Sequence, residues 1–169
     1  MVNILQKDDP ILRHKAVEVP VADISSAKIR AIIADMKKAL AGEKDGVAIA
    51  APQIGVPLRI FVVSGLLLKD MNLDKNATGE DQVFINPVIV KLSRTKEEME
   101  EGCLSVRYLY GTIKRATKAI VRAHDETGKI FERGGSGLLA QIFQHETDHL
   151  EGKLFIDFAK NVHEMEPEV

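Results

Sequence analysis

The sequence predicts an α+β fold of mostly antiparallel strands packed around one C-terminal helix, with a second helix near the N-terminus. Two stretches, residues 25–40 and 136–152, repeat their apolar residues at the spacing of one helix face. Between them lie short apolar stretches bounded by turn residues, which are typical of strands. The 169 residues contain no internal repeat and no Pro- or Gly-rich linker, so we expect residues 1–169 to form one domain.

The N-terminal helix is expected to begin at Ser25 or Ser26 and to end near Leu40. Serine is a favourable N-cap, and Gly42 is a suitable stop. The residues with helical spacing that would form its buried face are Ile29, Ile32, Ile33, Met36 and Leu40.

The middle of the chain is expected to supply the sheet. Residues 46–55, GVAIAAPQIG, are small and apolar and indicate a loop or an irregular strand. The predicted regular strands are residues 58–63, 82–90, 118–124 and 129–133. The last two are expected to form a hairpin through the turn at 125–128.

The C-terminal helix is expected to begin near Ser136 and to end at Gly152. Beyond it, residues 161–169 are acidic and are expected to fray. The charged stretch KEEMEEG at 96–102 is expected to be solvated, and Arg115 is expected to be a surface charge.

The composition excludes several classes of protein. Apolar residues make up 45% and charged residues 28%, which is ordinary for a globular protein, and the net charge of −2 provides no basic field for nucleic acid. One cysteine, Cys103, cannot form an internal disulfide and fits a reducing compartment. No apolar stretch approaches the ~18 residues of a membrane span. We therefore expect a cytoplasmic enzyme or binding protein without membrane contact or sequence-specific nucleic acid binding.

The stretch QHETDH at 144–149 places His145 and His149 four residues apart. On a helix this spacing puts both imidazoles on one face, about 40° apart around the axis, and Glu146 flanks that face. This is the H-E-x-x-H pattern, in which two imidazoles bind a metal and the carboxylate acts as a general base. The plainer interpretation is that both histidines are core residues whose ring nitrogens have local hydrogen-bond partners. That interpretation is favoured for a single histidine, whereas for the complete His-Glu-x-x-His set the metal site is favoured.

A metal ion held by two imidazoles needs a third protein ligand, and the sequence offers candidates both upstream and downstream of the histidines. Upstream, Cys103 follows Gly102, where the backbone can approach closely. An isolated cysteine is most simply a buried core residue. Beside two histidines, its thiolate would complete three ligands and leave one open position for water, as in catalytic metal sites. The downstream alternatives, as in proteases with this motif, are His163, Glu164, Glu166 and Glu168.

Such a metal would lower the pKa of its bound water toward neutrality. Glu146 would take the proton of that water and pass it to a leaving group. A carbonyl under attack becomes an oxyanion, which needs further hydrogen-bond donors. Gln53 offers a side-chain NH₂ group after a run of small residues. Taken in isolation, Gln53 could equally well be a polar residue that ends an apolar loop and has no role in catalysis.

Three stretches, GVAIAAPQ (46–53), EGCLS (101–105) and QHETDH (144–149), resemble in order and spacing the motifs of the peptide deformylases. The resemblance extends to DPILRHKAVEV, FINP and HLEGKLF, and it covers nearly the whole chain up to about residue 158. It implies an α+β fold with antiparallel sheets around the metal-binding helix. It also implies removal of the formyl group from the N-terminal formylmethionine of new polypeptides, with release of formate.

The resemblance further implies a role for each matching residue. Cys103, His145 and His149 would bind the metal, and Glu146 would be the general acid and base. The Gln53 side chain and the Leu104 N–H would bind the oxyanion. The metal would natively be Fe(II), with Zn(II), Ni(II) or Co(II) able to occupy the same site. The partners would be N-formylmethionyl peptides or nascent chains, with the ribosome as one expected place of encounter.

The implied substrate-binding residues are Gly46, Val47, Ala48, Glu101, Leu138 and Ile142, of which Val47, Leu138 and Ile142 would form the methionine pocket. Three departures concern substrate preference. Ala48 replaces the second glycine of the family's Gly-x-Gly, and Gln141 replaces a commonly apolar residue, which would make the pocket more polar. The basic C-terminal helix of many bacterial members is missing.

Two alternatives to a deformylase follow from the same residues. The first is an H-E-x-x-H endopeptidase with a downstream carboxylate as third ligand. The second is a relative that binds metal or peptide without turnover, which Ala48 and Gln141 motivate.

Overall fold

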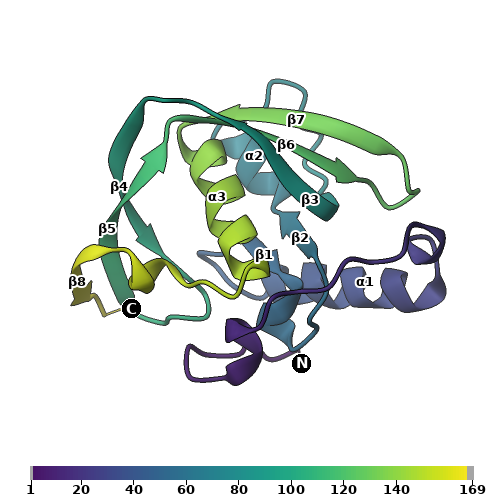
Figure 1. Ribbon diagram of the computed structural model, residues 1–169, viewed down its shortest axis with the longest axis horizontal. Coiled ribbons are helices and arrows are strands. Elements are labelled where there is room, and N and C mark those ends of the chain that lie inside the picture. The colour runs from purple at the N-terminus through teal and green to yellow at the C-terminus, as the bar shows by residue number, and fades with distance from the viewer. Residues whose placement is uncertain (1, 167–169) are drawn as a thin grey trace.

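The computed structural model describes residues 2–166 as two antiparallel sheets with helix α3 between them (Figure 1). The helices are α1 (Ala27–Ala41), α2 (Gly65–Asp70) and α3 (Leu138–Leu150). The larger sheet has the order β1 (Ala48–Ala50), β2 (Ile60–Val63), β3 (Gln82–Leu92), β6 (Lys118–His124), β7 (Ile130–Ser136). The smaller sheet has the order β4 (Lys96–Gly102), β5 (Leu109–Ala116), β8 (Lys160–Glu164). Short 3₁₀ helices occupy Pro10–Arg13, Val21–Asp23, Ala51–Ile54 and Phe155–Asp157. This arrangement confirms the predicted α+β class.

Strand β2 is apolar on both faces because each face is covered by a helix. Ile60 and Val62 pack in one core cluster with residues of α1 such as Ile33. Phe61 packs in a second cluster with Phe143 of α3. An alternating strand that is buried on both sides needs apolar residues at every position, which explains the continuous run IFVV.

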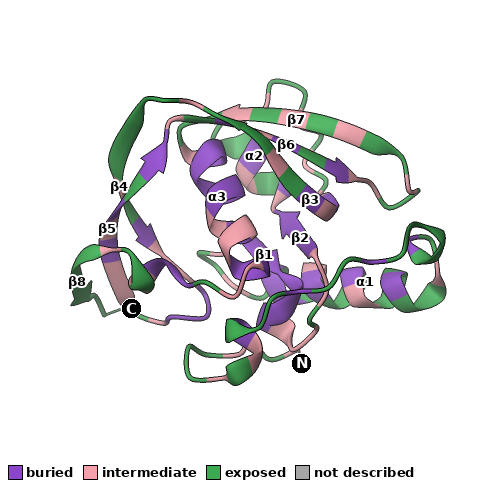
Figure 2. Ribbon diagram, viewed as in Figure 1, coloured by how far each residue is buried: buried purple, intermediate pink, exposed green. Residues whose placement is uncertain are grey.

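An aromatic cluster fixes α3 against the larger sheet. The ring centroids of Phe61 and Phe84 lie 4.5 Å apart, and those of Phe84 and Phe143 lie 5.5 Å apart in an edge-on arrangement. Figure 2 shows the buried residues concentrated in α3, β1 and β2, whereas β8 is exposed. Because Phe143 precedes His145 by two residues, it points to the opposite side of the helix, so this packing leaves the histidine face free.

Most predicted elements are confirmed. The helix expected at 25–40 is α1, capped by Ser26, whose hydroxyl accepts a hydrogen bond from the Ile29 N–H. The predicted hairpin is the antiparallel pair β6 and β7, and the two strands expected before it are β2 and β3. The predicted C-terminal helix is α3, and Gly152 follows it with φ of +74°.

Three expectations from the sequence are wrong or incomplete. The charged stretch at 96–102 is mostly exposed, as expected, but it forms the strand β4, which pairs with β5 along its whole length, and its Glu101 is buried. Residues 160–164, mostly within the predicted frayed tail, form β8 at the edge of the same sheet, while 167–169 lie outside the described residues. The short helix α2 was not predicted from the sequence. Pairing with a neighbouring strand satisfies backbone groups whatever the charge of outward-facing side chains, so charge alone misleads here. Among residues 2–166, no helix has both the length and the apolar character of a membrane span.

Gly152 offers a test of how α3 is connected to the N-terminal segment. A Cβ at this position would lie 2.4 Å from the Arg13 carbonyl oxygen, and φ is in the left-handed region. We expect Gly152→Ala to lower the free energy of unfolding by roughly 2–5 kcal/mol, from the backbone strain and the steric overlap together. The measurement is urea denaturation.

Gly128→Ala is the matched control, because Gly128 has φ of +87° but no atom within 4 Å of the added Cβ. In this variant the free energy of unfolding should fall only by the cost of the backbone strain, roughly 1–2 kcal/mol. Equal losses in the two variants would contradict the proposed contact with Arg13.

Candidate active site

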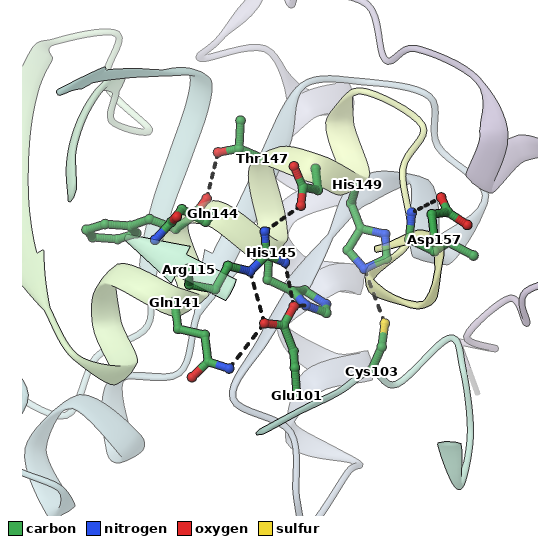
Figure 3. Close-up of polar contacts among 12 residues, drawn as sticks. Glu101, Cys103, Arg115, Gln141, Gln144, His145, Thr147, His149 and Asp157 are labelled. Carbon is green, nitrogen blue, oxygen red and sulfur yellow. Dashed lines mark hydrogen bonds and ion pairs between the residues drawn. The ribbon is translucent and has the colours of Figure 1, made fainter. Parts of the chain in front are cut away.

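Cys103, His145 and His149 converge at one point between the two sheets. One potential ligand atom from each residue lies within 4.8 Å of the other two. The Cys103 Sγ is 3.2 Å from the His149 Nε2, and the two imidazole centroids are 4.9 Å apart (Figure 3). Cys103 directly follows β4, while both histidines lie on α3. The fold thus brings together residues 46 positions apart in the chain.

This set of donors fits a divalent metal ion. One thiolate and two imidazoles are borderline-soft ligands suited to iron, zinc, cobalt or nickel, and three protein ligands leave a position open. Of the downstream alternatives, His163 and Glu164 lie in the exposed strand β8, Glu166 is exposed, and Glu168 is outside the described residues. Within residues 2–166, Cys103 is therefore the third potential ligand that the fold supplies.

Glu101 fixes the orientation of the His145 ring. Its Oε1 atom lies 2.5 Å from the His145 Nδ1, which leaves the His145 Nε2 available for a metal. A carboxylate behind a ligating histidine fixes the tautomer in this way in many metal sites. Burial by itself would raise the Glu101 pKa, but hydrogen bonds from His145 and Arg115 outweigh it and lower the pKa to about 2. Glu101 therefore remains ionised although it is only 6% exposed.

Arg115 is buried beneath the site, and the expectation that it is a surface charge is wrong. Its Nη2 donates to the Glu101 Oε1 at 2.6 Å, and its Nη1 donates to the Asp148 Oδ2 of α3 at 2.7 Å (Figure 3). Sequence reasoning also missed Asp148. The available signal was the alternation along β5, where Gly111, Ile113 and Arg115 are all buried. The arginine therefore ties the smaller sheet to the helix that carries the histidines.

Removal of Arg115 should strongly destabilise the protein. We expect Arg115→Ala to lower the free energy of unfolding by about 3–5 kcal/mol, because it leaves the buried Glu101 carboxylate without its cationic partner. The measurement is chemical denaturation.

Arg122→Ala is the matched control for this prediction. Arg122 pairs with Glu132 at 2.8 Å, but both side chains are about half exposed. That change should cost less than about 1 kcal/mol. Similar losses in the two variants would show that the buried network contributes no more than a surface pair.

Glu146 is a buried carboxylate with an unused oxygen. It is 3% exposed, and its Oε2 has no hydrogen-bond partner among the described residues. Burial raises the Glu146 pKa to about 7, although the neighbouring His145 opposes this shift. A carboxylate with a pKa near neutrality can both accept and return a proton at neutral pH.

Gln53 points its NH₂ group toward Cys103. Its Oε1 accepts a hydrogen bond from the Ala50 N–H at 2.8 Å, which fixes the orientation of the amide. Its Nε2 then lies 3.1 Å from the Ser105 Oγ and 3.8 Å from the Cys103 Sγ. Leu104 lines the same cavity as Gln53. Both predicted donor residues are thus at the site.

A cavity of about 250 Å³ opens beside these groups. The predicted substrate residues that line it are Val47, Ala48, Glu101, Leu138 and Ile142. Ala48 is only 4% exposed and also belongs to the core between α3 and the larger sheet. Gly46 is not among the lining residues, and a Cβ there would meet Leu40 instead. Its expected contact with substrate is not supported by this geometry.

Gln141 also lines the cavity, but its NH₂ group is already engaged. Its Nε2 donates to the Glu100 carbonyl at 2.9 Å and to the Glu101 Oε2 at 3.1 Å. Because both neighbours are acceptors, the amide oxygen must face away from them. Gln141 therefore supports Glu101 in addition to adding polarity to the cavity.

An α+β fold in which a Cys/His/His group lies beside a buried carboxylate has the residues of a metal-dependent hydrolase. Comparison with known proteins gives the family. The family model described as polypeptide deformylase matches residues 1–165. The chain belongs to this family, and it is a hydrolase that removes the formyl group from the N-terminal methionine of nascent polypeptides.

Individual relatives are similar over most of the chain. Peptide deformylase 2 of Clostridium acetobutylicum is 42% identical over 151 residues, which cover 89% of each protein. The crystal structure of a peptide deformylase from Legionella pneumophila is 42% identical with a TM-score of 0.80, over 94% of this chain and 86% of that one. Peptide deformylase 1A, chloroplastic/mitochondrial, of Arabidopsis thaliana is 38% identical over 91% of this chain, which spans only 60% of that relative's length.

Proposed function

We propose that Cys103, His145 and His149 hold one divalent metal ion and that deformylation takes place in the adjoining cavity. The observation that carries this proposal is the convergence of three ligand atoms within 4.8 Å beside the unpartnered Glu146 oxygen. When bound, the metal supplies a Lewis acid that makes water acidic near neutral pH.

Glu146 moves the proton in this proposal. Its free Oε2 accepts a proton from the attacking water and delivers it to the amine nitrogen that leaves the formyl carbon. Negative charge meanwhile develops on the formyl oxygen. The Gln53 NH₂ group and the Leu104 N–H donate to that oxygen, and the hydrogen bond from the Ala50 N–H to the Gln53 Oε1 keeps the NH₂ group turned toward the site.

The methionine side chain is proposed to lie against Val47, Leu138 and Ile142. These three apolar residues line the cavity together with His145, and Leu138 and Ile142 stand on α3 about one to two turns before the histidine. A side chain next to the reacting carbonyl can therefore reach them while the formyl group lies at the metal ligands.

The native metal is proposed to be Fe(II), with Zn(II), Ni(II) or Co(II) as functional substitutes. All four ions accept one thiolate and two imidazoles. A thiolate site with iron is sensitive to oxidation at Cys103. The proposed place of action is the cytoplasm, on nascent chains at the ribosome or on released formylated peptides.

Formate release tests the proposal directly. Protein prepared without oxygen and loaded with Fe(II) or Ni(II) is incubated with a short N-formylmethionyl peptide, and the same peptide without the formyl group is examined for internal cleavage. Formate without internal cleavage supports the deformylase. Internal cleavage without formate would instead support the H-E-x-x-H endopeptidase, and neither product from fully metallated protein would indicate a relative without turnover.

A further inference from the structure

Tyr108 has a backbone conformation that its side chain disfavours. It is the third residue of a turn from Val106 to Leu109, closed by a hydrogen bond from the Leu109 N–H to the Val106 carbonyl at 3.3 Å. Its φ is +65°. Turns with positive φ at the third residue favour glycine or asparagine. The other non-glycine residues with positive φ in residues 2–166 are all asparagines: Asn72, Asn86 and Asn161.

The strain at Tyr108 is not offset by burial of its ring. Tyr108 is 49% exposed, so it contributes little to any core cluster. A bulky residue with positive φ is uncommon, and such residues persist where surrounding contacts hold them and often where function needs them. The ring becomes useful only when something else covers it.

Contacts on both sides hold this turn in place. The Met165 N–H, just after β8, donates to the Tyr108 carbonyl at 2.9 Å, and β8 runs beside β5 (Figure 1). On the other side, the Arg107 guanidinium pairs with Asp45 at 3.1 Å and with Glu43. The backbone of Tyr108, and with it the direction of its Cα–Cβ bond, is therefore held in place before any substrate arrives.

The ring lies at the opening of the catalytic cavity. Tyr108, Leu109 and Tyr110 all line it, together with Cys103 and Glu146. Because Tyr108 is half exposed, it stands where the cavity meets solvent rather than at its floor. A peptide whose formyl group is at the metal ligands must leave the cavity through this opening.

We infer that Tyr108 is a specificity-determining residue that packs against an apolar or aromatic side chain following the formylmethionine. This inference rests on the proposed function of the same cavity. The aromatic ring offers a flat apolar surface at low entropic cost, because its backbone is already fixed.

The test compares two peptides of equal backbone length, formyl-Met-Leu-Phe-amide and formyl-Met-Gly-Gly-amide. The ratio of their kcat/KM values isolates the contribution of the side chains after methionine. Tyr108→Gly and Tyr108→Asn should lower this ratio roughly two- to tenfold, the range expected of one aromatic contact. Tyr108→Phe keeps the ring and should keep the ratio.

Thermal stability separates this role from a purely structural one. Because glycine relieves the strain at φ of +65°, Tyr108→Gly should have a melting temperature equal to or above that of the parent. An unchanged ratio in the Gly and Asn variants, or a lower melting temperature with an unchanged ratio, would overturn the inference. Absence of formate from both peptides with the parent protein would instead refute the proposed function.

Discussion

Glu146→Gln is expected to retain the metal and to lower kcat for formate release by about 10²- to 10⁴-fold. The amide has almost the same volume as the carboxylate, so the three ligand residues should stay in place. It cannot accept a proton, however, and the Oε2, which has no hydrogen-bond partner within residues 2–166 of the parent protein, is the atom to which we assign that step. The measurements are metal content per chain and single-peptide kinetics.

The same variant should be at least as stable as the parent. An ionised carboxylate that is 3% exposed, and one oxygen of which has no hydrogen-bond partner in the described part of the chain, is unfavourable, and a neutral amide removes part of that penalty. Glu132→Gln is the control, because Glu132 is about half exposed on β7, and its kcat should match the parent. A metallated Glu146→Gln protein with parental kcat would remove Glu146 from the proposed mechanism.

Cys103→Ala is expected to weaken metal binding by more than about 100-fold. Loss of a residue that merely supports a ligand typically costs 10- to 100-fold in metal affinity, so loss of a ligand should cost more. The Cys103 Sγ, the proposed third ligand atom, lies 3.2 Å from the His149 Nε2, and alanine offers no replacement. Metal titration with a chelator of known affinity measures the effect, and activity should fall with metal content.

His163→Ala is the matched control for metal binding. His163 lies on the exposed strand β8 and was one of the downstream alternatives to Cys103 as third ligand. Its removal should leave the metal affinity unchanged. Retained tight binding in Cys103→Ala together with lost binding in His163→Ala would reverse the assignment of the third ligand.

The central chemical residues could be predicted because their signal is local. Helix geometry alone puts His145 and His149 on one face with Glu146 beside them, and α3 realises that spacing. The third potential ligand, Cys103, was harder to predict, because it is 46 positions from His149 and no local sequence pattern connects the two residues. It could be proposed because two imidazoles are an incomplete site and the chain contains one cysteine.

The supporting residues could not be predicted, because their partners are distant in the chain. Arg115 meets Glu101 across 14 positions and Asp148 across 33, and both contacts depend on how β4 and β5 pack against α3. Tyr108 gave no signal either, since its strain arises from the turn that joins the segment after Cys103 to β5.

The sequence by itself therefore determined the α+β class, the helices α1 and α3, the β6–β7 hairpin and the choice of Cys103, His145, His149 and Glu146 as the residues proposed for the chemistry. Periodicity and short motifs carry that information because neighbouring residues impose it through local geometry. Only the tertiary structure decided that a charged stretch becomes β4, that the tail pairs as β8, and that Arg115 is buried. Those outcomes depend on backbone pairing and charge compensation between distant segments, for which a single sequence has no local signal.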